Sequence, residues 1–273
     1  FGRTLIYHSG VNPTTLVHFA KLPLILFFIL SGWLIYAWTR RIYNYRAALL
    51  AVFFFAFCPT IIAHSRFVTT DVPALFGVLF ATYFFLNYLK QPSISWQNRN
   101  FWLSIILFGV ALLTKFSLFL LVPYFLILAL VWAWSNHQTF FGPATRLITK
   151  TAIVMAMGFI IIVGPIYQLH VLNYSPIQQK NDTETLLKNY QIPVVTDTIV
   201  WASDKPVLRA YAQWGLGLAM VFQRAEGGNR TYFLGQFSDK SFKTYFPVVY
   251  VLKEPIPFLI LLLGAIWLGW QAW

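Results

Sequence analysis

Long apolar runs are the feature that most constrains the fold of this chain. Runs long enough, or nearly so, to cross a hydrocarbon layer of about 30 Å lie at about residues 22–38, 47–63, 72–89, 101–134, 151–169 and 247–270. Hydrophobic residues make up 58% of the 273 residues and charged residues 10%, a balance outside that of soluble domains. Because lipid cannot satisfy backbone polar groups, we predict an all-α, polytopic transmembrane helical protein.

The run at 101–134 is too long for one crossing. As a single helix its 34 residues would extend about 51 Å, and Lys115 interrupts it. We therefore predict two spans that meet at Lys115, and seven crossings in all. With this split the Lys- and Arg-containing segments 39–46, 90–100 and 135–150 all fall on the cytoplasmic side, as the positive-inside rule requires.

The same topology predicts the domain organisation. Residues 1–169 hold an N-terminal external segment and the transmembrane helices of the core, 170–246 form an extracytoplasmic helical loop subdomain, and 247–273 add a further transmembrane helix. The Asp71 loop and the Lys115 turn then face the extracytoplasmic side. The first residue is Phe1 rather than Met, and Trp273 ends an apolar run, so we expect the chain to be part of a longer protein.

Asp71 is the only carboxylate in the first 181 residues, and it lies between two apolar stretches. An ionisable group at the edge of a hydrocarbon layer is costly unless it is paired, hydrated or used, so it indicates a functional site. His64, Arg66, Thr69 and Thr70 lie in the same short segment. The structural alternative is that Thr70 or Asp71 caps the helix that follows. Capping would not exclude a role in chemistry.

Two further positions carry charge where apolar residues dominate. Lys115 is the lone cation between residues 101 and 134; it either snorkels to the headgroup region or holds a lipid phosphate. Lys253 and Glu254 precede Pro255 and Pro257, which would interrupt a helix. These two charges either form an ion pair at a kinked helix start or belong to broken helix ends that line a polar cavity.

Charge and motifs exclude several classes of protein. The net charge of +12 comes from basic residues spread over short loops, which indicates membrane topology and attraction to anionic lipid rather than nucleic-acid binding. The chain has no Gly-rich nucleotide loop, paired-His zinc signature or nucleophile elbow. We therefore expect no required cofactor; a divalent metal is compatible with the chain, but no ligand cluster supports one.

Three segments carry a family resemblance: PTIIAHSRFVTTDVP at 59–73, GVALLTKFS at 109–117 and YFPVVYVLKEP at 245–255. They resemble conserved blocks of the protein O-mannosyltransferase and aminoarabinose-transferase group, which are membrane glycosyltransferases of the C-type fold. The resemblance implies transfer of a sugar from dolichyl or undecaprenyl phosphate, with inversion, to a protein or to a lipid or glycan acceptor. It places the reaction on the extracytoplasmic side of a plasma, inner or endoplasmic reticulum membrane.

The resemblance also implies roles for particular residues. Asp71 matches the second acidic position of the group, whereas the acid of the first external loop would precede Phe1. Lys115 matches a lysine near the lipid phosphate, and Lys253 falls in a third, less understood block.

The chemistry of the reaction agrees with these roles. Attack by a hydroxyl on an anomeric carbon needs a base, and a leaving phosphate needs cations or hydrogen-bond donors. We predict Asp71 as the catalytic residue, Arg66, Lys115 and Lys253 as phosphate-binding residues, and His64, Thr70 and Glu254 as candidates for accessory roles.

Two other functions remain open from the sequence. A transporter or flippase of lipid-linked sugars would place polar residues near the membrane midplane, whereas here the ionisable groups collect at one edge of the spans. A scaffold subunit without a site would have no need of an acid beside His64 and Arg66. Both comparisons favour a transferase that meets its substrates at the membrane surface.

Overall fold

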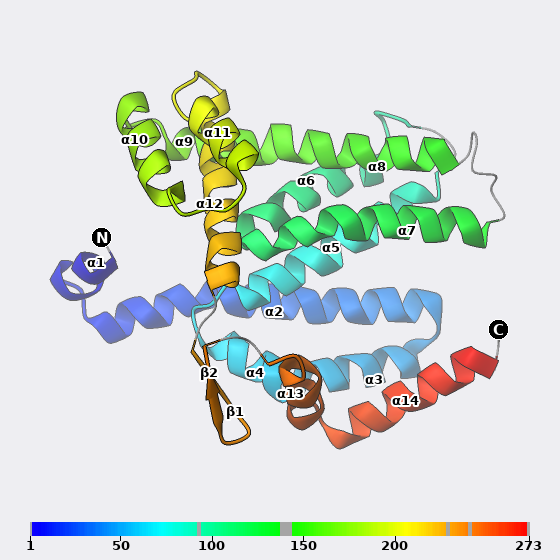
Figure 1. Cartoon of the computed structure of the whole chain (residues 1–273). Coiled ribbons are helices and arrows are strands. Elements are labelled where there is room, and N and C mark those ends of the chain that lie inside the picture. The colour runs from blue at the N-terminus through cyan, green and yellow to red at the C-terminus, as the bar shows by residue number, and fades with distance from the viewer. Residues whose placement is uncertain (1, 92–93, 137–143, 228–229, 240–241, 272–273) are drawn as a thin grey trace. The chain divides into compact units, whose positions relative to one another are not determined.

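The computed structural model describes residues 2–91, 94–136, 144–227, 230–239 and 242–271, and these are almost entirely helical (Figure 1). This confirms the predicted all-α class. The chain divides into two compact units, one of Phe1–Phe76 with Arg230–Trp273 and the other of Gly77–Asn229. The segment 170–246, predicted as one subdomain, is thus shared between the units.

The first unit contains most of the N-terminal helices and the C-terminal part of the chain. Its helices and strands are α1 (Gly2–His8), α2 (Pro13–Ile42), α3 (Tyr45–Ala56), α4 (Pro59–Arg66), β1 (Thr231–Phe233), β2 (Gln236–Ser238), α13 (Tyr245–Lys253) and α14 (Ile256–Gln271). The helix α5 (Asp71–Leu89) begins in this unit and continues into the second. The hairpin β1–β2 was not predicted, since the sequence indicated helices for this segment.

Helix α2 begins at Pro13, earlier than the predicted start near residue 22. The side chain of Asn12 accepts a hydrogen bond from the backbone N–H of Thr14 at 2.9 Å, and Pro13 occupies the first helical position. Both features stabilise a helix N-terminus. Hydropathy marks the lipid-facing part of such a helix, whereas capping decides where it starts.

Two helix pairs of the first unit bend at a proline. The axes of α3 and α4 differ by 56°, with Pro59 at the start of α4, and those of α13 and α14 differ by 114°. Glu254 is extended between α13 and α14 and precedes Pro255, as is usual before proline. The predicted interruption by the prolines is confirmed, but the run at 247–270 is not one straight crossing.

The second unit is a bundle of long helices joined to a set of shorter ones (Figure 1). After α5 its elements are α6 (Arg99–Thr114), η1 (Phe116–Leu120), α7 (Leu121–Ser135), α8 (Thr145–Gly158), η3 (Phe159–Val163), α9 (Gly164–His170), α10 (Pro176–Leu187), α11 (Pro193–Ala202) and α12 (Leu208–Gly227). The core is aromatic: the rings of Phe85 and Phe125 stack at 4.0 Å, and both side chains are fully buried.

The predicted break at Lys115 is confirmed. Helix α6 ends at Thr114, Lys115 is extended, and helical structure resumes at Phe116. The rings of Phe108 and Phe125, on opposite sides of the break, lie 5.6 Å apart, so the chain turns back on itself here.

Helices α6 and α8 approach each other closely at glycines. A Cβ added to Gly109 would lie 2.6 Å from the carbonyl oxygen of Gly158 and 2.5 Å from Cβ of Ile162. Small residues at such crossings let helix backbones pack tightly within a membrane. A larger residue at position 109 would therefore force the two helices apart.

Among the described residues, four helical stretches are long and apolar enough to cross a bilayer: Pro13–Ile42, Asp71–Leu89, Phe116–Ser135 and Thr145–His170. The number rises to six if each bent pair counts as one span. The seventh predicted crossing corresponds to α6, which has only 16 residues, or about 24 Å.

Lys150 corrects one part of the predicted topology. It was expected to be a cation of the loop 135–150, but it lies within α8 and is fully buried. Its Nζ donates to the carbonyl oxygens of Tyr88 at 3.0 Å and Gln91 at 2.8 Å, and it lies 4.3 Å from the centre of the Tyr88 ring. Carbonyls at a helix C-terminus lack intrahelical partners and attract cations, so Lys150 caps α5.

This contact also bears on the arrangement of the loops. Because Lys150 lies in α8 and contacts Tyr88 and Gln91, the end of α5 and the start of α8 lie close together at one end of the second unit. The positive-inside argument requires that the loops next to these two helix ends share a side of the membrane.

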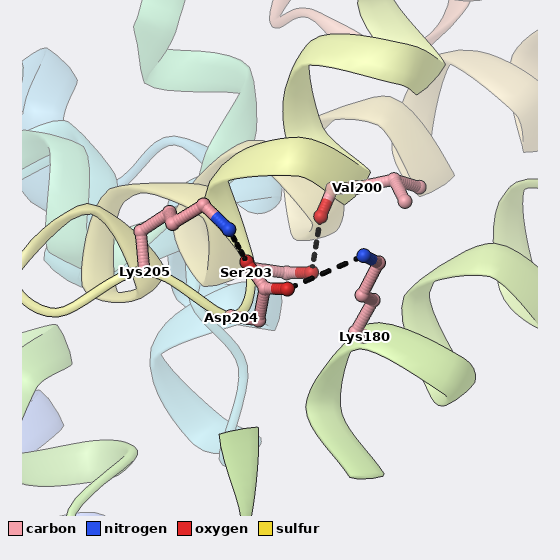
Figure 2. A network of polar contacts seen from close by, with 5 residues as sticks. All are labelled: Lys180, Val200, Ser203, Asp204 and Lys205. Atoms are coloured by element: carbon pink, nitrogen blue, oxygen red, sulfur yellow. Dashed lines mark hydrogen bonds and ion pairs between the residues drawn. The ribbon is translucent and has the colours of Figure 1, made fainter. Parts of the chain in front are cut away.

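A polar network joins the short helices α10 and α11 (Figure 2). The carboxylate of Asp204, just after α11, pairs with Nζ of Lys205 at 2.8 Å and with Nζ of Lys180, on α10, at 3.2 Å. The neighbouring Ser203 hydroxyl donates to the carbonyl of Val200 at 2.6 Å. Hydrogen bonds from Lys205 and then Lys180 lower the pKa of Asp204.

Replacing Lys150 with Met tests its capping role. The variant keeps the length of the side chain but leaves buried carbonyl oxygens of α5 without a donor, so we expect a loss of about 1–3 kcal/mol in the free energy of unfolding. Unfolding in mixed micelles measures this, with Lys188→Met at an exposed position as the control. Equal stability of the two variants would contradict the capping role.

Replacing Asp204 with Asn tests the network in Figure 2. Since the pKa of the folded carboxyl lies below its ordinary value of 3.8, its ion pairs stabilise the protein above that pH, and the contribution is lost as the pH falls through the lowered pKa. We expect the variant to melt below the parent at pH 7, with the difference shrinking in acid. The control is Asp197→Asn on the exposed side of α11; a pH-independent difference would refute the assignment.

Candidate functional site

The candidate site is built on the connection between α4 and α5. Helix α4 ends at Arg66, and α5 begins at Asp71. The carbonyl of Thr70 accepts the first backbone hydrogen bond of α5, from the N–H of Ala74 at 3.0 Å. Thr70 thus holds the capping position and Asp71 lies in the first turn, where the helix dipole favours a negative charge.

The structure brings His64 and Asp71 together. Nδ1 of His64 lies 3.1 Å from Oδ2 of Asp71, and the two side chains are 45% and 37% exposed. When Nδ1 carries a proton it donates to the carboxylate, and Nε2 remains for a ligand. Asp71 is therefore oriented by a partner while part of its carboxylate stays accessible, as a base that meets a substrate requires.

Two other side chains contribute to this connection. Arg66 is exposed at the end of α4, two residues after His64. The hydroxyl oxygen of Thr69 is buried and has no hydrogen-bond partner within the described part of the chain. Sequence analysis placed Thr69 in the Asp71 segment but assigned it no role, because a threonine next to a capping residue carries no signal of its own.

Lys115 lies in the second unit, at the break between α6 and η1. Its extended backbone ends α6, and its carbonyl accepts a hydrogen bond from the N–H of Leu118 at 3.0 Å. The side chain is neither fully buried nor fully exposed. The break thus presents a cation at the end of a predicted span, and this position is compatible with either snorkelling to the headgroups or phosphate binding.

Lys253 and Glu254 lie at the sharp bend between α13 and α14. Within the described ranges no ion pair joins them, so the predicted mutual ion pair is wrong. Glu254 instead contacts Cys58 of the α3–α4 bend, with 3.8 Å between Oε2 and Sγ. Nothing in the sequence signals this contact, because 196 positions separate the two residues.

A cavity of about 640 Å³ lies within the first unit, between the two bent helix pairs. Its wall is mostly apolar and consists of Ala47, Leu50, Ala51, Phe54, Phe55, Cys58, Thr60, Ile61, Tyr250, Glu254, Pro255, Phe258, Leu261, Leu262 and Ala265. The broken helices do line a cavity, as one alternative predicted. The prediction that the cavity is polar is wrong, and Lys253 is not part of its wall.

The described residues offer no cluster of metal ligands. No group of three or more His, Cys, Asp or Glu side chains is placed to hold a metal ion in the part of the chain that the structure describes. The acidic and imidazole groups near α5 are His64 and Asp71, which form a pair rather than a ligand set.

Comparison with protein-family models identifies a family for the chain. The family model described as dolichyl-phosphate-mannose-protein mannosyltransferase matches residues 18–163, which is more than half of the chain. The matched range includes Asp71 and Lys115 but ends before Lys253. No curated protein and no solved structure matches the chain.

Proposed function

We propose that this membrane glycosyltransferase takes its sugar from a polyprenyl phosphate. The chain belongs to the dolichyl-phosphate-mannose-protein mannosyltransferase family, and this membership supports the proposal. The family description favours mannose on a dolichyl carrier and a protein acceptor. Undecaprenyl phosphate as carrier and a lipid or glycan as acceptor are the alternatives. We place the reaction on the extracytoplasmic side of the membrane.

The observation that carries this proposal is the pairing of His64 with Asp71 at the start of α5. In the proposed step the acceptor hydroxyl gives its proton to the Asp71 carboxylate while its oxygen attacks the anomeric carbon. The bond from that carbon to the phosphate oxygen breaks, and the lipid phosphate leaves with the electron pair. A single displacement of this kind inverts the anomeric centre. His64 holds the carboxylate in position through Nδ1.

The leaving phosphate needs positive charge or hydrogen-bond donors around it. We assign this role to Arg66 and Lys115, and to Lys253 from outside the range matched by the family model. The Thr70 hydroxyl and Glu254 have proposed accessory roles. Since a phosphate leaves readily once its charge is stabilised, this mechanism requires no metal.

Replacing Asp71 with Asn tests the proposal. The amide keeps the shape of the side chain but cannot accept the proton, so we expect transfer from dolichyl-phosphate mannose to fall by about 10²-fold or more. The partly exposed position predicts little change in melting temperature. The measurement uses the full-length protein in nanodiscs with a labelled donor and candidate acceptors.

The control variant is Asp197→Asn, which changes an exposed carboxylate of α11 and should leave transfer unchanged. Retained transfer by a folded Asp71→Asn protein would remove Asp71 from the mechanism. If the parent protein moves the lipid-linked sugar across the bilayer and forms no glycosylated product, the flippase function replaces the transferase.

A further inference from the structure

The hairpin of β1 and β2 has an unusual residue at its tip. The strands pair Thr231 with Ser238 and Phe233 with Gln236, so Leu234 and Gly235 form a two-residue turn. The φ angles of Leu234 and Gly235 are 49° and 85°. Two-residue turns with positive φ at both positions favour Asn, Asp or Gly.

Leu234 is therefore unfavourable in two respects. Its backbone adopts a left-handed conformation that is uncommon for residues other than glycine, asparagine and aspartate. Its side chain is 73% exposed in the structure. A polar residue would suit both the turn and an aqueous environment better. Backbone outliers of this kind indicate a role for the side chain.

The two faces of the hairpin differ. On one face Phe233 is nearly buried, with its ring 5.4 Å from that of Phe242 and 5.3 Å from that of Tyr245. On the other face Tyr232 and Phe237 form a cross-strand pair 5.1 Å apart, and they are 61% and 68% exposed. The first face attaches the hairpin to the start of α13, and the second carries an aromatic pair that the described residues leave exposed.

The chemistry of the exposed face matches the boundary of a bilayer. Aromatic side chains are enriched at membrane interfaces, and arginine reaches from apolar surroundings toward headgroups. Arg230 lies over the Phe237 ring, with 5.4 Å from its Cζ to the ring centre. A cation beside an aromatic pair and an apolar tip is the composition of a segment that lies at the lipid surface.

The hairpin is also continuous with an apolar surface. Tyr245, which packs against Phe233, begins α13, where Phe246, Val251 and Leu252 are exposed. Helix α13 leads through the 114° bend into α14, and together the pair has the length and composition of a membrane span. The face of the hairpin that carries Phe233 thus attaches it next to an exposed apolar helix of predicted membrane character.

We propose that the hairpin Thr231–Ser238 inserts its tip into the lipid leaflet, with Leu234 at the acyl boundary and Tyr232 and Phe237 at headgroup level. Insertion gives the apolar turn residue a favourable environment that water does not. Arg230 then lies among the lipid phosphates. The hairpin anchors the segment that precedes α13 to the membrane, a role separate from sugar transfer.

A fluorescent probe at Leu234 tests the proposal. Cys58 is the only cysteine of the 273 residues, so the full-length protein, with Cys58 and any cysteine outside these residues changed to Ser, accepts one NBD label at Leu234→Cys. The protein is reconstituted in nanodiscs of phosphatidylcholine and phosphatidylglycerol. We expect loss of NBD emission with doxyl-labelled lipid and little loss with aqueous iodide.

Two matched positions calibrate the measurement. Leu263→Cys on the exposed surface of α14 reports lipid, and Glu184→Cys on the exposed surface of α10 reports water. A Leu234 probe that behaves like Glu184 overturns the proposal. Protection from both quenchers also overturns it, because the tip would then contact protein. The same measurement at Phe237→Cys covers the case in which the label at Leu234 disturbs the turn.

Discussion

The interactions at the start of α5 are the constraint on which the candidate site depends. An isolated carboxylate beside a hydrocarbon layer is unfavourable unless it has a partner and a reason to remain ionised. At the N-terminal end of α5, Asp71 has His64 as that partner. At the other end, the buried ammonium of Lys150 donates to the carbonyl oxygen of Tyr88 in the last turn and to that of Gln91 just beyond the helix. Both ends of the helix that carries the acid are thus tied to other helices.

The sequence could predict the helices because a hydrocarbon layer leaves the backbone few choices. The length limit of a span located the break at Lys115, and the prolines after Glu254 located a second interruption. The bend of 114° could not be predicted, since proline removes a hydrogen bond without fixing the new direction. Lys150 was misplaced because its partners lie about 60 positions away in the chain. The sequence around position 150 does not distinguish a lysine in a loop from a buried lysine that caps another helix.

Part of the candidate site could likewise be predicted from the sequence, and part could not. His64 and Asp71 are seven positions apart, so a short loop sufficed to predict that they lie near each other. The contact between Cys58 and Glu254 joins distant segments through two bent helix pairs, and no local pattern encodes it. The hairpin could not be predicted from a local pattern either, because Leu234 is not of the residue type expected in such a turn.

The most direct test of the Asp71 site is a structure of the full-length protein bound to a non-transferable polyprenyl-phosphate mannose. We predict that the anomeric carbon of the bound sugar lies next to the Asp71 carboxylate, with room for one acceptor hydroxyl between them, and that His64 keeps its contact with Asp71. A donor whose sugar lies away from the start of α5 would contradict the account.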